Sequence, residues 1–271
     1  MSQTKRSGNL GKILVTILVV ILVLLVVAEF AARWFVGHQL KTEYEEQVAA
    51  TGAEVKEDPS VHFGLSPLLL NYFRDVVPTI DADLPDTVSI QQGKQAGDPP
   101  EIAGLPASQL HFDDLNIADT RNLTAKHLRV HANLTDEYLL ASLQRGLAEN
   151  SPATGNTALD GIVGQASKVT GVHSDPARGA IMVQFADGLA ELAVKPTPSP
   201  QGLNFAADSA SVLGFQLPPE ITQRITQALQ DGAQRVTKGL KLEDAKVQDG
   251  GLDITVGGND VNISELKNQV Q

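Results

Sequence analysis

The sequence contains no cysteine. This absence excludes disulfides, cysteine nucleophiles, iron–sulfur clusters and cysteine-bound zinc. Three motifs of common enzyme classes are missing as well: the nucleophile elbow Gly-x-Ser-x-Gly, a phosphate-binding loop ending in Gly-Lys-Ser/Thr, and the metalloprotease sequence His-Glu-x-x-His. With 271 residues the chain can bury a core without covalent cross-links. We expect a non-enzymatic protein that holds no metal and no cofactor.

Basic residues are scarce, because 21 Lys and Arg stand against 32 Asp and Glu. Nucleic-acid affinity comes mostly from basic side chains, so we expect no nucleic-acid partner. Three of the basic residues, Lys5, Arg6 and Lys12, lie within the first twelve positions, which hold no acid. The rest of the chain is therefore strongly acidic, and an acidic surface disfavours electrostatic adhesion to anionic lipid headgroups.

One long hydrophobic run lies near the N-terminus. The sixteen residues from Ile13 to Ala28 carry no charge, and only Thr16 is polar. As a helix this run is about 24 Å long, and flanking residues extend it toward the roughly 30 Å of a bilayer core. The sequence predicts one transmembrane anchor over residues 13–36. Within it, Glu29 and Arg33 have the spacing to neutralise each other near a membrane surface.

The orientation of the anchor follows from the positive-inside rule. The basic tail 1–12 is expected in the cytoplasm, and the chain after the anchor outside the plasma membrane. A cleaved secretory signal is the alternative, although no clean small-x-small cleavage site follows the run. Residues 37–53 instead continue a helical pattern, which predicts a juxtamembrane helix. Under both interpretations the remainder of the chain is exported across the membrane.

The remainder has the pattern of one α+β domain, residues 54–264, followed by a tail at 265–271. Alternating apolar and polar side chains predict antiparallel strands with one face in water, most clearly over 128–134, 181–185 and 252–256. We expect one long antiparallel sheet with two main helices.

Two segments have helical patterns. Thr135 is placed to cap a helix over 136–149, which has acids in its first turn and one apolar stripe. Pro218-Pro219 can open a longer helix to about residue 238. Three stretches have the composition of loops, namely 91–106, 150–161 and the proline-rich 195–202.

Histidines and acids give weak candidate sites. His127 and His131 have the spacing of a helical metal pair, but in a strand they are about 13 Å apart. We interpret them as exposed strand residues. Asp81, Asp83 and Asp86 resemble the start of a calcium loop, yet the glycine and glutamate of that loop are missing. An acidic turn is the simpler interpretation.

A second hydrophobic segment lies between residues 65 and 73, and it has two interpretations. It can be a core-packing turn or short helix. Alternatively, it can be an exposed lip that admits a lipid tail or touches a bilayer. The side chains on which the lip depends are Leu65, Leu68, Leu69, Leu70 and Phe73.

Three stretches occur in a particular order: His62-Phe-Gly-Leu-Ser-Pro-Leu-Leu69, the helix start Leu217-Pro-Pro219, and the closing segment from Gly251 to Ile263. With the basic, hydrophobic N-terminus, they resemble the LmeA-type family of actinobacterial envelope proteins that bind phospholipids. The resemblance implies a tubular lipid-binding fold, in which a strongly curved antiparallel sheet wraps around a long helix. It also implies an apolar groove for acyl or polyprenyl chains and a role in elongating the mannan of lipomannan. It carries over no catalytic residue.

We therefore predict a membrane-anchored extracytoplasmic protein that binds a phospholipid or a polyprenyl-type lipid. It would support lipoglycan assembly in the cell envelope, with an envelope glycosyltransferase as a further partner. The helix after Pro219 would line the groove with Ile221, Ile225, Leu229 and Val236.

Two other hypotheses stay open. An enzyme that processes envelope glycolipids could use Asp113 or Asp114, although neighbouring strand residues face opposite sides unless a β-bulge intervenes. The apolar phase does slip between residues 110 and 117, which predicts such a bulge. The third hypothesis is a structural module that tethers a glycosyltransferase to the membrane.

Overall fold

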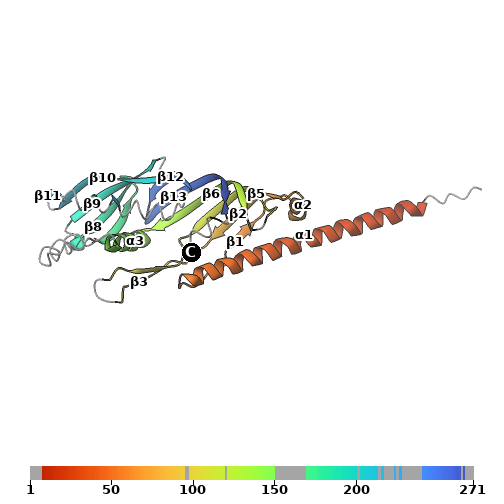
Figure 1. Cartoon of the computed structure of the whole chain (residues 1–271), viewed down its shortest axis with the longest axis horizontal. Helices are drawn as coiled ribbons and strands as arrows, with labels where there is room; N and C mark the ends of the chain where they lie inside the picture. Colours follow the sequence, from red (N-terminus) through yellow and green to blue (C-terminus); the bar gives the residue numbers. More distant parts are fainter. Residues whose placement is uncertain are drawn as a thin grey trace, which may run out of the picture.

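The computed structural model describes residues 8–94, 98–119, 121–149, 169–188, 190–199, 202–212, 215–216 and 240–263, together with residues 223, 226, 227 and 265. The molecule is elongated, and one long helix runs beneath a sheet-rich domain and projects beyond it (Figure 1). The fold is the expected α+β fold with antiparallel strand pairs and an apolar N-terminal helix. The predicted helix at 219–238, with its four apolar residues, lies outside the described residues apart from isolated positions.

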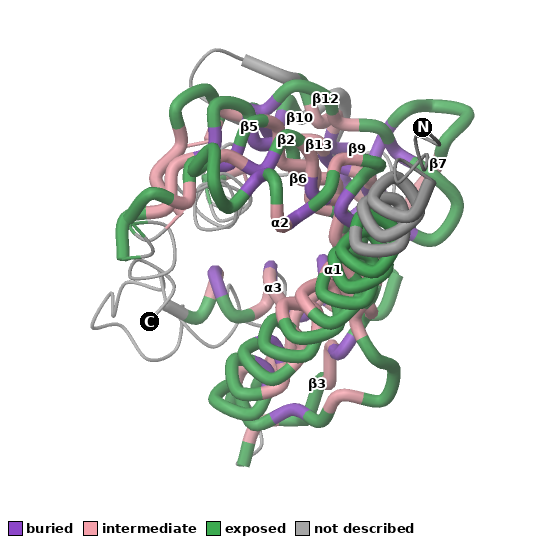
Figure 2. Tube along the Cα trace, turned by 90° about the vertical axis from the view of Figure 1, so that its right-hand side faces the viewer, coloured by how far each residue is buried: buried purple, intermediate pink, exposed green. Residues whose placement is uncertain are grey.

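The long helix is α1 (Gly8–Ala50), with 43 residues. It joins the predicted anchor and the predicted juxtamembrane segment without a break. Residues 18–28 are exposed on every side of the helix, as Figure 2 shows for its projecting part. Contact with the domain begins at Glu29. Further along, Tyr44 and Val48 are buried in a cluster with Leu84 and Leu105, so the second half of α1 belongs to the domain.

The larger sheet has six strands in the order β1-β2-β5-β6-β13-β12. Its strands are β1 (Ser60–His62), β2 (Val76–Leu84), β5 (Ser108–Asn116), β6 (Thr124–Thr135), β12 (Lys241–Gln248) and β13 (Gly251–Asn262). A short helix, α2 (Leu68–Tyr72), precedes β2. Alternation along β6 and β13 turns one apolar face inward, as predicted.

The smaller sheet has five strands in the order β11-β10-β9-β8-β7. Its strands are β7 (Val169–Asp175), β8 (Ala180–Phe185), β9 (Ala190–Ser199), β10 (Gly202–Val212) and β11 (Phe215–Gln216). The strands thus divide between two large sheets rather than forming one long sheet. Helix α3 (Asp136–Glu149) begins where predicted, because the Thr135 hydroxyl accepts the Tyr138 N–H at 3.2 Å. Both sheets and α3 share one core, which includes Leu143, Phe185 and Leu252.

Two segments expected as loops contain strands. The first, 91–106, contains β4 (Glu101–Ala103), which forms a two-stranded sheet with β3 (Ser89–Gln91) at its start. In the proline-rich segment, β9 continues to Ser199 and pairs with β10. Its pairing with β8 ends at Val194, so Pro196 and Pro198 lie where β9 has one neighbouring strand. Proline is tolerated at such edges because its missing N–H breaks no ladder bond.

The predicted phase slip on β5 is present, but it is not a bulge of one strand. Asp114 has a left-handed φ of 47°, yet the register of β5 with β2 and β6 does not shift. Instead, one residue on each of four neighbouring strands is left out of the pairing, and these four residues lie side by side across the sheet. They are Pro78 on β2, Asp114 on β5, Lys126 on β6 and Asp260 on β13. Because all four strands change phase together, none needs an extra residue. Aspartate is among the few non-glycine residues that tolerate a left-handed backbone.

Candidate functional site

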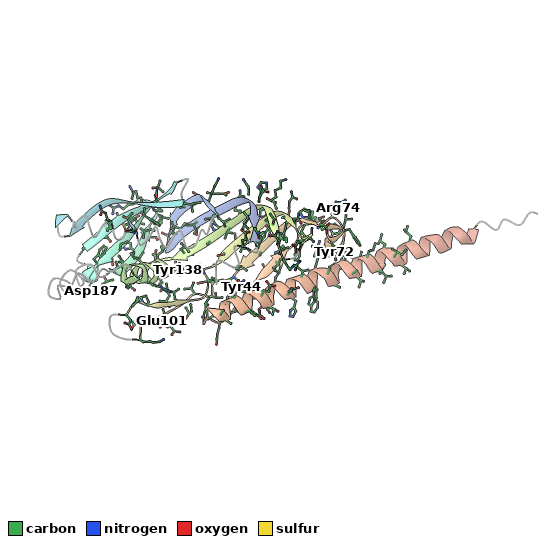
Figure 3. The ribbon with its side chains drawn as sticks, in the orientation of Figure 1. Tyr44, Tyr72, Arg74, Glu101, Tyr138 and Asp187 are labelled. Atoms are coloured by element: carbon green, nitrogen blue, oxygen red, sulfur yellow. The ribbon has the colours of Figure 1, made fainter. Side chains whose placement is uncertain are left out.

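The segment from Leu65 to Phe73 has features of both interpretations of the sequence: one part packs into the core as a short helix, and the other part is an exposed lip. Leu68 on α2 is buried in a cluster with Phe63, Val77 and Ile80, and Leu69 is half-buried. The other side chains face outward: Leu65 and Leu70 are exposed, and Phe73 is 82% exposed. Tyr72, also exposed, lies at the end of the domain from which α1 projects (Figure 3). We call the exposed set Leu65, Leu70, Tyr72 and Phe73 the lip.

The lip is held on α1 by polar contacts of Glu29 and Arg33, and we call these two residues the clamp. Pro67 occupies the N-cap position of α2 and provides no side-chain cap, so the first N–H groups of that helix need another acceptor. The Glu29 carboxylate accepts the N–H groups of Leu68, at 2.7 Å, and Leu69, at 3.0 Å. A helix 40 residues earlier in the chain therefore caps α2.

Arg33 completes the clamp. Its Nε donates to Glu29 Oε1 at 2.7 Å, which is the ion pair predicted from the four-residue spacing. Its two terminal nitrogens donate to the carbonyl oxygens of Ser66, at 3.0 Å, and Gly64, at 3.3 Å. The pair thus holds both the turn before α2 and its first residues against α1. Sequence reasoning found the pair but not its partners.

Aromatic side chains of α1 lie at the level of the clamp. Phe30, Trp34 and Phe35 are each at least 63% exposed, and the Trp34 ring stacks on His38. Tryptophan is typical of membrane–water interfaces, because its apolar ring carries one polar N–H group. The exposed helix, these aromatics and the lip therefore gather apolar surface at one end of the domain.

Behind the lip an apolar track follows the inner face of the larger sheet. Along β6 it consists of Leu128, Val130, Ala132 and Leu134. Leu128 belongs to the cluster around α2, and Leu134 to the core shared by the two sheets. Val130 and Leu240 are only partly buried and contact both clusters. The track thus leads from the lip into the domain. At its middle, the side chains of Val130 and Leu240 remain partly exposed in the described part of the structure.

A model of the family described as LmeA-like phospholipid-binding matches residues 27–257. This chain belongs to that family. The matched region begins at Val27 and so includes the clamp, the lip and the track. Searches of curated proteins and of solved structures find no significant match.

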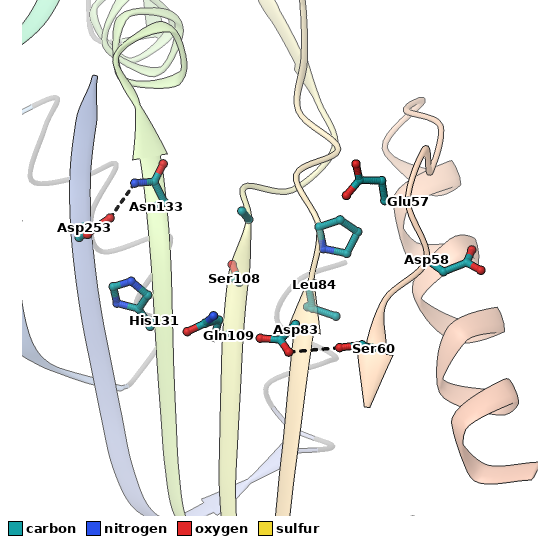
Figure 4. Close-up of a pocket in the computed structure, with 12 residues that line it drawn as sticks. Glu57, Asp58, Ser60, Asp83, Leu84, Ser108, Gln109, His131, Asn133 and Asp253 are labelled. Carbon is teal, nitrogen blue, oxygen red and sulfur yellow. Dashed lines mark hydrogen bonds between the residues drawn. The ribbon is translucent and has the colours of Figure 1, made fainter. Parts of the chain in front are cut away.

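The outer face of the larger sheet is too polar to hold the acyl chain of a phospholipid. A groove of about 470 Å³ lies there, between the strands and the segment that follows α1 (Figure 4). Its lining includes four acids, Glu57, Asp58, Asp83 and Asp253, and polar residues such as Gln109, His131 and Asn133. Asp83 accepts the Ser60 hydroxyl and Asn133 donates to Asp253. Apolar chains and anionic headgroups are both disfavoured in such surroundings.

His111 is bound between two carboxylates on the same outer face. Its Nδ1 lies 2.5 Å from Asp81 Oδ1, and its Nε2 lies 3.3 Å from Asp113 Oδ1. The hydrogen bond to Asp81 raises the pKa of His111 above its ordinary value, against partial desolvation and with further help from the Asp113 charge. Both ring nitrogens face acceptors, so the arrangement favours the imidazolium form.

The other candidate residues are dispersed. His127 and His131 lie on β6, as predicted, and contact Asn259 and Thr255 respectively. The prediction that Asp81, Asp83 and Asp86 form an acidic turn was wrong for two of these residues, because Asp81 and Asp83 lie within β2.

The two candidate catalytic acids also have separate partners. Asp113 contacts His111, whereas Asp114 Oδ2 lies 3.3 Å from Lys126 Nζ. Each carboxylate thus has a different basic partner, and neither lines the outer groove.

Proposed function

We propose that this protein is anchored in the plasma membrane and takes a lipid from the outer leaflet through the lip into its domain. The N-terminus would lie in the cytoplasm and the domain outside. The observation that carries the proposal is the clamp of Glu29 and Arg33, because it holds the lip beside the point where α1 leaves the domain. Membership of the LmeA-like phospholipid-binding family supports the lipid class.

The path of the lipid follows from where apolar surface is available. Residues 18–28 of α1 are exposed on all sides, which suits a bilayer. The lip would lie at the level of the headgroups, with Phe73 and Leu70 toward the acyl chains. An acyl chain that passes between them reaches Leu68 and then Val130 on the track. Each buried methylene would gain about 0.8 kcal/mol.

The lipid is a phospholipid or a polyprenyl-type lipid, and its use is the assembly of envelope lipoglycan such as lipomannan. An envelope glycosyltransferase would then be the partner that consumes the delivered lipid. The resemblance described above supports this finer role. The contacts of Asp113 and Asp114 favour no second, enzymatic function.

The proposal is tested with the full-length chain in detergent micelles, by native mass spectrometry for co-purified lipid and by uptake of a fluorescent phospholipid. Leu70→Asp and Phe73→Asp together should reduce uptake at least about tenfold, since each places a charge on the path of the acyl chain. Ile90→Asp is the matched control, because Ile90 is an exposed hydrophobic residue on β3, away from the lip. Absence of bound lipid and of uptake in the unmodified chain would contradict the proposal.

A further inference from the structure

Asn71 on α2 has an unsatisfied polar group. The residue is 1% exposed, and its Oδ1 accepts the hydroxyl of Ser66 at 2.9 Å. Its Nδ2, which can donate two hydrogen bonds, has no acceptor in the part of the chain that the structure describes. Buried donors in folded proteins nearly always have a partner, because leaving one unpaired is costly. This amide therefore has a hydrogen-bond donor that no described residue uses.

The surroundings of Asn71 restrict which molecule could bring that oxygen. Asn71 and Leu68 are the two buried residues of α2, and Leu68 packs among Phe63, Val77 and Ile80. On the outer side of the same segment are Leu70 and Phe73, which belong to the lip. The amide thus lies between the apolar interior and the surface where a lipid would enter. A ligand that fits here has an apolar chain with an acceptor oxygen at its polar end.

The charge available at this point favours an uncharged oxygen. Desolvating a phosphate requires cationic or multiple donor groups. The Arg33 guanidinium of the clamp already donates to Glu29, Ser66 and Gly64. Arg74, three residues after Asn71, is exposed, so its guanidinium lies on the outer side of the lip and not beside the buried amide. A carbonyl oxygen, in contrast, is satisfied by one neutral amide donor.

We propose that Asn71 Nδ2 donates a hydrogen bond to an acyl-ester carbonyl oxygen of the bound lipid. This inference rests on the proposed function and refines it, because it selects ester-linked phospholipids over lipids without an ester carbonyl, such as ether-linked phospholipids and polyprenyl phosphates. Asn71 then determines specificity at the boundary between the acyl chains and the headgroup.

The experiment compares two lipids that differ only at that carbonyl. The full-length chain in maltoside micelles is loaded with a fluorescent phospholipid, which is displaced by diacyl phosphatidylglycerol or by its dialkyl-ether analogue of equal chain length. One neutral hydrogen bond should make the diacyl lipid about five- to tenfold the better competitor. Asn71→Leu should bind both lipids equally. Because it removes the acceptor of the Ser66 hydroxyl as well as the unpaired donor, its folding is checked by circular dichroism.

The control variant is Asn133→Leu on the outer face of β6, which should keep the preference. Equal competition by both lipids in the unmodified chain would overturn the inference and leave the proposed function standing. A preference that persists in Asn71→Leu would overturn it too. If neither lipid nor the probe binds the unmodified chain, the proposed function itself fails.

Discussion

At the residue scale, the polar side chains of this protein act mainly as connectors. Glu29 and Arg33 form the ion pair that their spacing predicts, but their main contacts are backbone groups of residues 64–69. A carboxylate that accepts two backbone N–H groups is a strong acceptor, since charge-assisted hydrogen bonds are about twice as strong as neutral ones. One acid thus determines where the lip lies relative to α1.

Glu29→Ala should release α2 from α1. The N–H groups of Leu68 and Leu69 lose their acceptor, so the local stability of α2 should fall by about 1 to 3 kcal/mol. Hydrogen exchange of these two amides, measured in the full-length chain in micelles, should be faster by a corresponding factor. Glu45→Ala is the control, because Glu45 contacts Lys41 on the same helix at 3.8 Å. Unchanged exchange in Glu29→Ala would show that the clamp does not hold α2.

His111 should make stability depend on pH. Its pKa is raised in the folded state, chiefly by the hydrogen bond to Asp81. The stabilisation is therefore fully present below the unfolded pKa of about 6.5 and is lost as pH rises through the folded pKa. The difference in thermal unfolding midpoint between the unmodified chain and His111→Asn should be larger at about pH 5.5 than at about pH 8.5. A difference that grows with pH would contradict the imidazolium assignment.

At the element scale, local patterns predicted elements and long-range contacts decided how they are used. Strand β6 and the Thr135 cap of α3 follow from alternation and from one hydroxyl, which are local features. The β3–β4 hairpin was missed because nine residues separate its short strands, Gln91 and Glu101 being paired. The cap of α2 was missed because its acceptor is far away in sequence. The lip was one of two interpretations, since local apolarity does not show which side of α2 packs.

The two halves of α1 should differ in their effect on folding. A chain that begins at residue 29 keeps the clamp and the buried side chains of Tyr44 and Val48. A chain that begins at residue 54 loses them, and each buried apolar side chain contributes about 1.5 to 3 kcal/mol. The longer chain should therefore unfold at a clearly higher urea concentration. Far-UV circular dichroism suits this comparison, because the single tryptophan, Trp34, is absent from the shorter chain. Equal midpoints would mean that α1 is only a tether.

At the scale of the whole molecule, charge and apolar surface are separated. The three basic residues of the first twelve positions precede the exposed helix, and the acids belong almost wholly to the domain beyond it. The outer face of the larger sheet is acidic and polar, whereas the lip and the projecting helix are apolar. Such a molecule is held at a membrane by its apolar end and not by attraction to anionic headgroups. The acidic domain would then stand away from the bilayer except at the lip.

The absence of cysteine makes this orientation directly measurable. Single cysteines are introduced as Ser2→Cys, in the basic tail, and as Asp249→Cys, at the exposed turn between β12 and β13. In intact cells a membrane-impermeant maleimide should label Asp249→Cys, because the positive-inside rule predicts that the domain lies outside. Ser2→Cys should react only after the membrane is permeabilised. If Ser2→Cys stays unlabelled even then, and the mature protein begins near residue 30, the N-terminal helix is a cleaved signal. The clamp argues against cleavage after Glu29, because that cleavage removes the carboxylate that caps α2.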